Sequence, residues 1–166
     1  MTPDWSRILE EHGQAVFQAA FRILGQRSDA EDTSQEVFLE ACSSPQAGGV
    51  RNWGAYLRKL AVFRALDLRR RRRNLTSLDA CVLPADSSNP CDEAVRHELA
   101  DRMRDIIAAL PEREGAVFTL RYHELLSNPQ IAEVLEISVG AVAAAIHKVR
   151  AKLETMIAET SKGALP

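Results

Sequence analysis

Cysteine is scarce in this sequence, and long hydrophobic runs are absent from it. The 166 residues include three cysteines, Cys42, Cys81 and Cys91, an odd number at wide spacing. Neither a disulfide framework nor a zinc site follows from such a set, and a reducing compartment is the default. No run of about 18 apolar residues is present to span a membrane, and the first residues lack the basic-then-apolar layout of a secretory signal. We therefore predict a cytoplasmic protein with no membrane span.

Sequence signatures of catalysis are missing as well. The chain has no recognisable pair of nucleophile and base, no metal-ligand spacing and no glycine-rich phosphate loop. We therefore expect no catalytic residue, no bound metal and no cofactor, and we predict that the protein is not an enzyme. The hydrophobic content of 46% is ordinary for a globular protein and supplies enough apolar material for a core.

Positive charge is concentrated in one segment. The whole chain has a net charge of -2, but residues 51–73 hold nine Arg and Lys against the single acid Asp67, a charge of +8, which leaves -10 for the rest. The apolar residues of this segment recur mostly at three- and four-residue steps, which predicts a helix with one buried and one cationic face. Its five consecutive arginines cover every direction around a helix, so a phosphate backbone is their expected partner. A merely solvated charge run is the alternative.

An acidic strip is predicted on the helix that begins near Ser28. Asp32, Gln35, Glu36 and Leu39 stand at i, i+3, i+4 and i+7 and therefore share one side of this helix. Two interpretations are open. The strip is either a plain solvated face or an interaction surface for a basic partner.

The composition divides the chain into two helical domains. Residues 74–91 are rich in Pro, Ser and Thr and lack an amphipathic period, which is typical of a flexible linker. In the following domain, Ser127 is placed to cap a short helix over 128–135 and Ser138 to cap a longer last helix, the layout of a helix-turn-helix. The predicted fold is all-α, with domains at 1–73 and 92–166.

Three segments match the signature blocks of one family, in the right order and spacing. They are DAEDTSQEVFLEA (29–41), NWGAYLRKLAVFRALDLRRRRR (52–73) and LPEREGAVFTLRYHELLSNPQIAEVLEISVGAVAAAIHKVRAKL (110–153). The sequence thus resembles the small bacterial RNA polymerase sigma factors of the extracytoplasmic-function group. The resemblance covers nearly the whole chain, with a region 2-like first domain and a region 4-like second domain.

The resemblance implies three sets of binding residues. The first would contact the clamp helices of the largest subunit of the RNA polymerase core: Asp29, Glu31, Asp32, Gln35, Glu36 and Leu39. The second would engage and open the -10 promoter element: Asn52, Trp53, Tyr56, Arg58, Lys59, Arg64, Arg69, Arg70, Arg71, Arg72 and Arg73. The third would contact the -35 element: Ser138, Ala141, Ala144, His147, Lys148 and Arg150. The loop over 45–52 lies where family members capture a flipped base, and an anti-sigma factor is a common further partner in the family.

This sequence departs from the family pattern at several positions. Phe63 stands where Asn is usual, and Glu136 replaces the usual Gly of the helix-turn-helix turn, where a positive backbone angle is often needed. Alanines occupy positions of the last helix where polar or basic residues are typical, and alanine cannot donate to a base edge. We therefore hypothesise weak or unusual -35 recognition.

Three functions remain open on the sequence alone. The first is a promoter-specificity subunit that binds core polymerase, recognises a promoter and opens it. The second is a polymerase-binding or protein-interaction regulator with weakened -35 recognition, which the alanine-rich last helix favours. The third is a free-standing nucleic-acid-binding regulator that uses only the arginine tract. The acidic strip speaks against the third function, because such a regulator has no need of it.

Overall fold

Every regular element of the computed structural model is a helix within the residues it describes, 3–45, 47–78 and 91–162. The first domain contains α1 (Trp5–Leu24), α2 (Arg27–Ser43), the short 3-10 helix η1 (Ala47–Gly49) and α3 (Trp53–Leu78). The second contains α4 (Cys91–Ala109), α5 (Glu112–Phe118), the π-helical segment η2 (Thr119–His123), α6 (Asn128–Leu135) and α7 (Val139–Lys162). The predicted all-α class is confirmed.

Small residues let α1 and α3 approach closely. Ala19 and Ala20 of α1 and Ala61 and Ala65 of α3 are fully buried, so the two helix backbones pack with little side-chain volume between them. Gly25 ends α1 in a left-handed conformation with φ of 76°. Glycine is favoured here by this backbone angle, and a Cβ atom at this position would lie 2.8 Å from the Arg104 guanidinium, which would have to shift.

The helix-turn-helix is formed by α6 and α7, as predicted. At the start of α6, the backbone N–H of Ser127 donates to Gln130 Oε1 at 2.9 Å. At the start of α7, the backbone N–H of Ala141 donates to Ser138 Oγ at 3.1 Å. Glu136, in the turn, has a φ of 56°. The positive angle expected there is therefore present, although the residue is not glycine.

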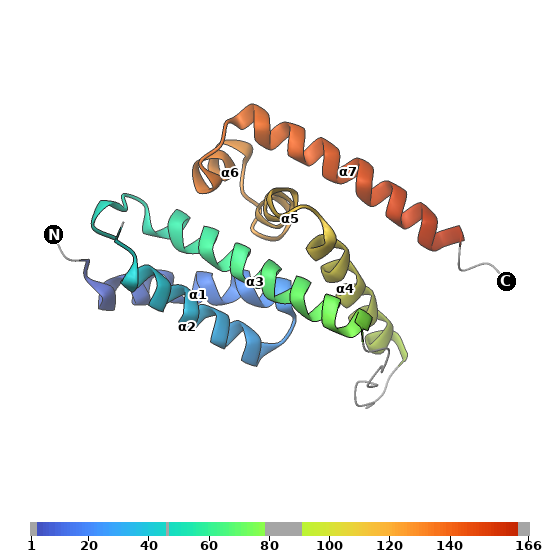
Figure 1. The fold of residues 1–166 in the computed structure, drawn as a ribbon, viewed down its shortest axis with the longest axis horizontal. Helices are drawn as coiled ribbons and strands as arrows, with labels where there is room; N and C mark the ends of the chain where they lie inside the picture. The colour runs from blue at the N-terminus through green and yellow to red at the C-terminus, as the bar shows by residue number, and fades with distance from the viewer. Residues whose placement is uncertain (1–2, 46, 79–90, 163–166) are drawn as a thin grey trace.

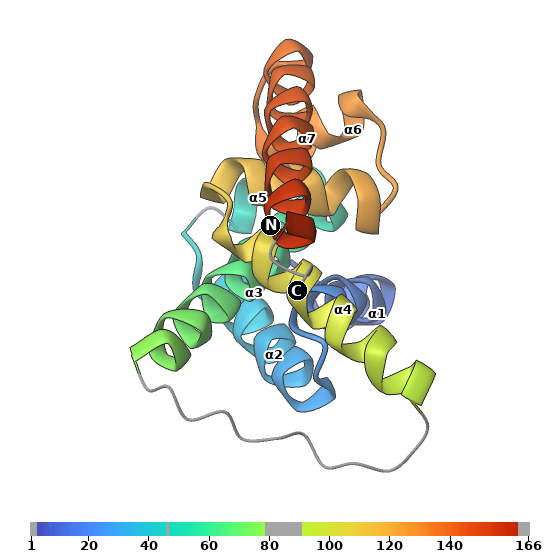
Figure 2. The same ribbon diagram turned by 90° about the vertical axis from the view of Figure 1, so that its right-hand side faces the viewer.

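The two domains share one hydrophobic core, which the sequence did not predict. The core cluster includes Leu57 and Leu66 of α3 together with Val117 and Leu120 from α5 and η2. Figure 1 shows α3 between α1 and α2 on one side and α5 and α6 on the other, and α3 contacts α4, α5 and α6. Figure 2 shows α7 on the opposite side of the molecule from α2.

The boundaries of the expected linker differ from the prediction. Asn74 to Leu78 continue α3 as helix, and α4 already begins at Cys91. Residues 79–90, the remainder of the predicted linker, lie outside the described residues. No single described helix is long and apolar enough to cross a membrane, and α6 with α7 satisfies that test only as a pair bent by 105°.

Candidate functional site

The acidic strip of α2 lies exposed on one face, as the spacing predicted. Asp32, Gln35 and Glu36 are exposed, and Leu39 keeps 67% of its surface accessible. Gln35 and Leu39 border an apolar groove of about 500 Å³ between α1 and α2. An exposed leucine beside carboxylates costs hydration free energy in the free protein, so this face is suited to a partner that is both basic and apolar.

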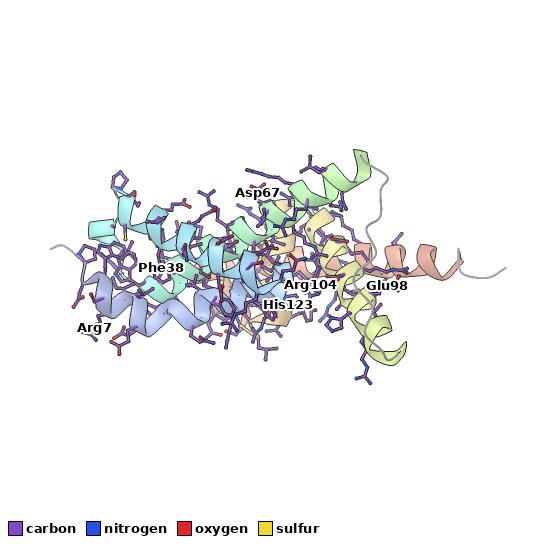
Figure 3. All side chains as sticks on the ribbon, turned by 90° about the horizontal axis from the view of Figure 1, so that it is seen from below. Arg7, Phe38, Asp67, Glu98, Arg104 and His123 are labelled. Carbon is purple, nitrogen blue, oxygen red and sulfur yellow. The ribbon has the colours of Figure 1, made fainter. Side chains whose placement is uncertain are left out.

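Helix α1 also contributes to this face, which the sequence pattern did not predict. Leu9 lines the same groove and is 54% exposed. Phe38 also lines the groove and is half-buried against the core (Figure 3). The only sequence signal for Leu9 is that it lies beside the buried Ile8, on a different side of α1.

Asp29 and Glu31 differ from the other four residues of the expected polymerase-binding set. The Asp29 carboxylate is buried and accepts two hydrogen bonds from the Arg72 guanidinium, one of them 2.7 Å long. These hydrogen bonds hold the pKa of Asp29 below its usual value despite the opposing effect of burial. Glu31 is exposed and pairs with Arg27 at 2.8 Å. Asp29 therefore joins α2 to α3 and does not lie on the exposed strip.

Most of the basic side chains of α3 have partners inside the protein. Arg69 donates to Asp105 Oδ1 at 2.8 Å and to the Leu24 carbonyl at 2.9 Å. Arg70 donates to the carbonyls of Ala108 and Leu110, at the end of α4. The remaining pairs are Arg58 with Glu124 at 3.5 Å, Lys59 with Glu136 at 2.9 Å, Arg64 with Glu40 at 2.7 Å and Arg71 with Asp67 at 2.7 Å. Arg73 is exposed, without an ion pair to any described residue.

An aromatic cluster holds the start of α3. The rings of Trp53 and Trp5 meet edge to face at 5.0 Å, and Tyr56 lies 5.8 Å from Trp53 in a second edge-to-face contact. Asn52 precedes the helix, and its Oδ1 accepts from the Ala55 N–H at 2.9 Å. These contacts fix the loop that enters α3.

A cleft of about 530 Å³ lies between this loop and α6. Its lining comes from the loop and the first turn of α3 on one side and from α6 on the other: Pro45, Gly49, Val50, Arg51, Asn52, Ala55, Tyr56, Glu133, Val134 and Glu136. Asn52 Nδ2 donates across the cleft to Glu133 Oε1 at 2.8 Å. The loop expected to capture a base thus faces the second domain.

The residues expected to contact the -35 element lie on α7 and on the turn before it. Ala144, His147 and Lys148 are exposed, and Ala141 is half-buried. Ser138 is exposed but already accepts the hydrogen bond at the start of α7, and Arg150 Nε donates to the Tyr122 hydroxyl at 2.8 Å. His147 and Lys148 therefore supply exposed polar groups on α7.

His123 lies where the two domains meet, together with Arg104 (Figure 3). Burial lowers the pKa of His123, and the nearby cations Arg22 and Arg104 lower it further. Arg22 also pairs with Glu124 at 2.8 Å, and Arg104 donates to the Arg22 carbonyl at 3.1 Å. No sequence pattern marked His123, because the charges that act on it come from distant segments.

Two family models match the two domains separately. The Sigma-70 region 2 model matches residues 8–75, and the Sigma-70, region 4 model matches residues 100–153. Together they cover more than half of the chain and define a two-domain protein of the sigma-70 type.

Two individual proteins of similar sequence show which group of sigma factors the chain belongs to. The ECF RNA polymerase sigma factor SigL of Mycobacterium tuberculosis is 31% identical over 145 residues, which cover 84% of this chain and 81% of SigL. The ECF RNA polymerase sigma factor SigE of Mycolicibacterium smegmatis is 28% identical over 165 residues, which cover 96% of this chain but 63% of SigE. The chain belongs to the ECF RNA polymerase sigma factors.

A solved structure supports the fold. It is that of the sigma factor RpoE from Bartonella quintana in complex with the anti-sigma factor NepR, with a TM-score of 0.55 and 15% identity. The match covers 93% of this chain and 96% of that one. At this identity the likeness concerns the fold alone, and it extends over both domains.

Proposed function

We propose that this protein binds the RNA polymerase core and directs promoter recognition and opening at the start of transcription. The observation that supports this most directly is the exposed strip of Asp32, Gln35, Glu36 and Leu39 beside an apolar groove. The strip would dock on the clamp helices of the largest subunit. Leu9 extends the proposed contact onto α1.

Promoter opening would use the start of α3 and its exposed cations. Pro45 and residues 49–52 line, together with Tyr56, a cleft that offers both an aromatic ring and polar groups to an unstacked base. Arg71 and Arg73 are exposed and can approach phosphates. No catalytic residue is required, because binding to the unpaired strand offsets the free energy of unstacking.

The second domain would contact the -35 element weakly. Ala143 and Ala144 occupy the exposed side of α7 beside His147 and Lys148, and alanine offers only a methyl contact to a thymine. The alternative of a regulator that has lost promoter reading is not favoured, because the family matches include both regions. The proposed site of action is the cytoplasm, and an anti-sigma factor is a further proposed partner.

Charge reversal tests the docking face. We expect the variant Asp32→Lys/Glu36→Lys to lose co-purification with core polymerase, because both carboxylates are exposed and free to meet a basic partner. The matched control is Glu112→Lys/Glu154→Lys, which makes the same change in net charge at exposed positions of the second domain. Helical circular dichroism should match the wild type in both variants. Undiminished co-purification of the first variant would overturn the proposed docking face.

A further inference from the structure

The surface of α3 that is proposed to open promoters is covered by acidic side chains of the second domain. Lys59 Nζ lies 2.9 Å from Glu136 Oε1, and Asn52 Nδ2 donates to Glu133 at 2.8 Å. The buried carboxylate of Glu124 lies 3.5 Å from Arg58 Nε. These carboxylates thus already pair with the cations and the amide that DNA phosphates and bases would otherwise contact.

Glu136 reaches Lys59 from an unfavourable backbone conformation. Its φ of 56° is in the left-handed region, which side chains other than those of Gly, Asn and Asp rarely adopt. Such outliers persist where the surroundings hold them and are often found at functional contacts. Glycine would suit this angle better, but it could not supply the carboxylate that pairs with Lys59.

The same two glutamates form the wall of the cleft opposite the loop. Glu133 and Glu136 line it together with Asn52 and Tyr56. A nucleotide entering the cleft would bring its negative phosphate next to two carboxylates, and like charges at this range repel. Closure of the second domain therefore disfavours entry of DNA into this cleft.

We propose that Glu133 and Glu136 act as an acidic latch, which holds the helix-turn-helix domain over the promoter-opening surface of α3 and keeps the free protein closed to nucleic acid. The inference rests on the proposed function, since it assumes that this surface meets DNA. A polyanion releases the latch by competing for Lys59 and Asn52. The apparent affinity for DNA then falls in proportion to the open fraction of the protein.

A zero-length cross-link tests the closed state directly. A carbodiimide joins an ammonium to a carboxylate only where the two are in contact, so the closed protein should yield an amide between Lys59 and Glu136, detected by mass spectrometry of peptides. The pair Lys152 and Glu114, 2.6 Å apart within the second domain, is the internal control. A single-stranded oligonucleotide should abolish the first cross-link and spare the second. If the free protein yields the Lys152–Glu114 cross-link but no Lys59–Glu136 cross-link, the proposal is overturned.

Binding of a single-stranded oligonucleotide of random sequence tests the consequence. We expect Glu133→Gln/Glu136→Gln to raise its affinity about three- to tenfold by fluorescence anisotropy, as two exposed polar pairs of ordinary strength would allow. Glu112→Gln/Glu154→Gln removes the same charge away from the cleft and should leave the affinity within twofold. An equal gain in both variants would mean that bulk charge alone acts and would refute the latch.

Co-purification with core polymerase separates the two proposals. The latch variant should bind core at the wild-type level or better, because the strip on α2 is untouched. If neither the variant nor the wild type binds core, the proposed function fails, whereas the cross-link still decides whether the latch closes. If both bind core and the oligonucleotide affinities are equal, the latch alone is refuted.

Discussion

The turn between α6 and α7 offers a test in which backbone strain and an ion pair act in opposite directions. Glu136 closes α6 in the left-handed conformation, and the following N–H of Ile137 donates back to the Ala132 carbonyl at 3.0 Å. This six-to-one hydrogen bond is typical of a helix end at which glycine is preferred. Substitution by Gly should relieve the strain, whereas substitution by Gln should keep it, and both changes remove the ion pair with Lys59.

The expected magnitudes follow from the geometry. Glu136 is 75% exposed at its side chain and Lys59 is 29% exposed, so their pair contributes at most about 0.2–1 kcal/mol. A residue with a Cβ in the left-handed region costs about 1 kcal/mol relative to glycine after the unfolded-state entropy is counted. Glu136→Gln should therefore lower the free energy of unfolding slightly, and Glu136→Gly should exceed Glu136→Gln by about 1 kcal/mol.

Urea denaturation followed by circular dichroism measures this difference. In thermal denaturation, the same difference of about 1 kcal/mol corresponds, for a chain of this size, to a Tm difference of roughly 2–4 °C. Glu154→Gly, inside α7, is the control of opposite sign, because glycine in a helix interior costs about 1 kcal/mol. A Glu136→Gly variant no more stable than Glu136→Gln would refute the assignment of strain to this turn.

Two further predictions concern buried titratable groups. The pKa of Asp29 is lowered by Arg72, so its stabilisation is present above the ordinary carboxyl pKa and is lost as pH falls through the folded value. Asp29→Asn should therefore lower the free energy of unfolding, measured by urea denaturation, by about 1–3 kcal/mol at pH 7. The loss should shrink as the pH falls below the ordinary carboxyl pKa. The pKa of His123 is lowered by burial and by Arg22 and Arg104, so stability is full above about pH 6.5 and falls as the pH drops toward the folded value. His123→Gln should flatten this fall between pH 7.5 and 5.5, and a midpoint that still drops as in the wild type would contradict the assignment.

Local sequence signals predicted the helices and several of their ends. Gly25 ends α1, Ser138 caps α7, and the turn of the helix-turn-helix contains the expected positive φ. Each of these features depends on residues within a few positions of one another, where capping and backbone angles are decided. The strip from Asp32 to Leu39 was predictable for the same reason, since helical spacing alone places its members on one face.

Contacts between distant segments could not be predicted. The sequence showed correctly that five arginines cannot all pair within α3, but it gave no sign that Asp29 and Asp105 would meet Arg72 and Arg69. The periodicity of α3 indicated one buried face, whereas α3 packs against helices on two sides. Charge counts describe a segment in isolation, and the partner of each charge is decided by the tertiary arrangement.

The arginine tract therefore has two kinds of members, and this divides its roles. Arg69 and Arg70 are half-buried and donate to carbonyl oxygens at the ends of α1 and α4, where a cation also offsets the negative end of the helix dipole. Arg71 and Arg73 are exposed, and Arg71 pairs with Asp67 of the same helix, so both can reach phosphates without disturbing the core. The number of phosphates that the closed protein can neutralise is consequently smaller than its count of arginines. Full engagement of DNA by this tract would require α4 to move away from α3.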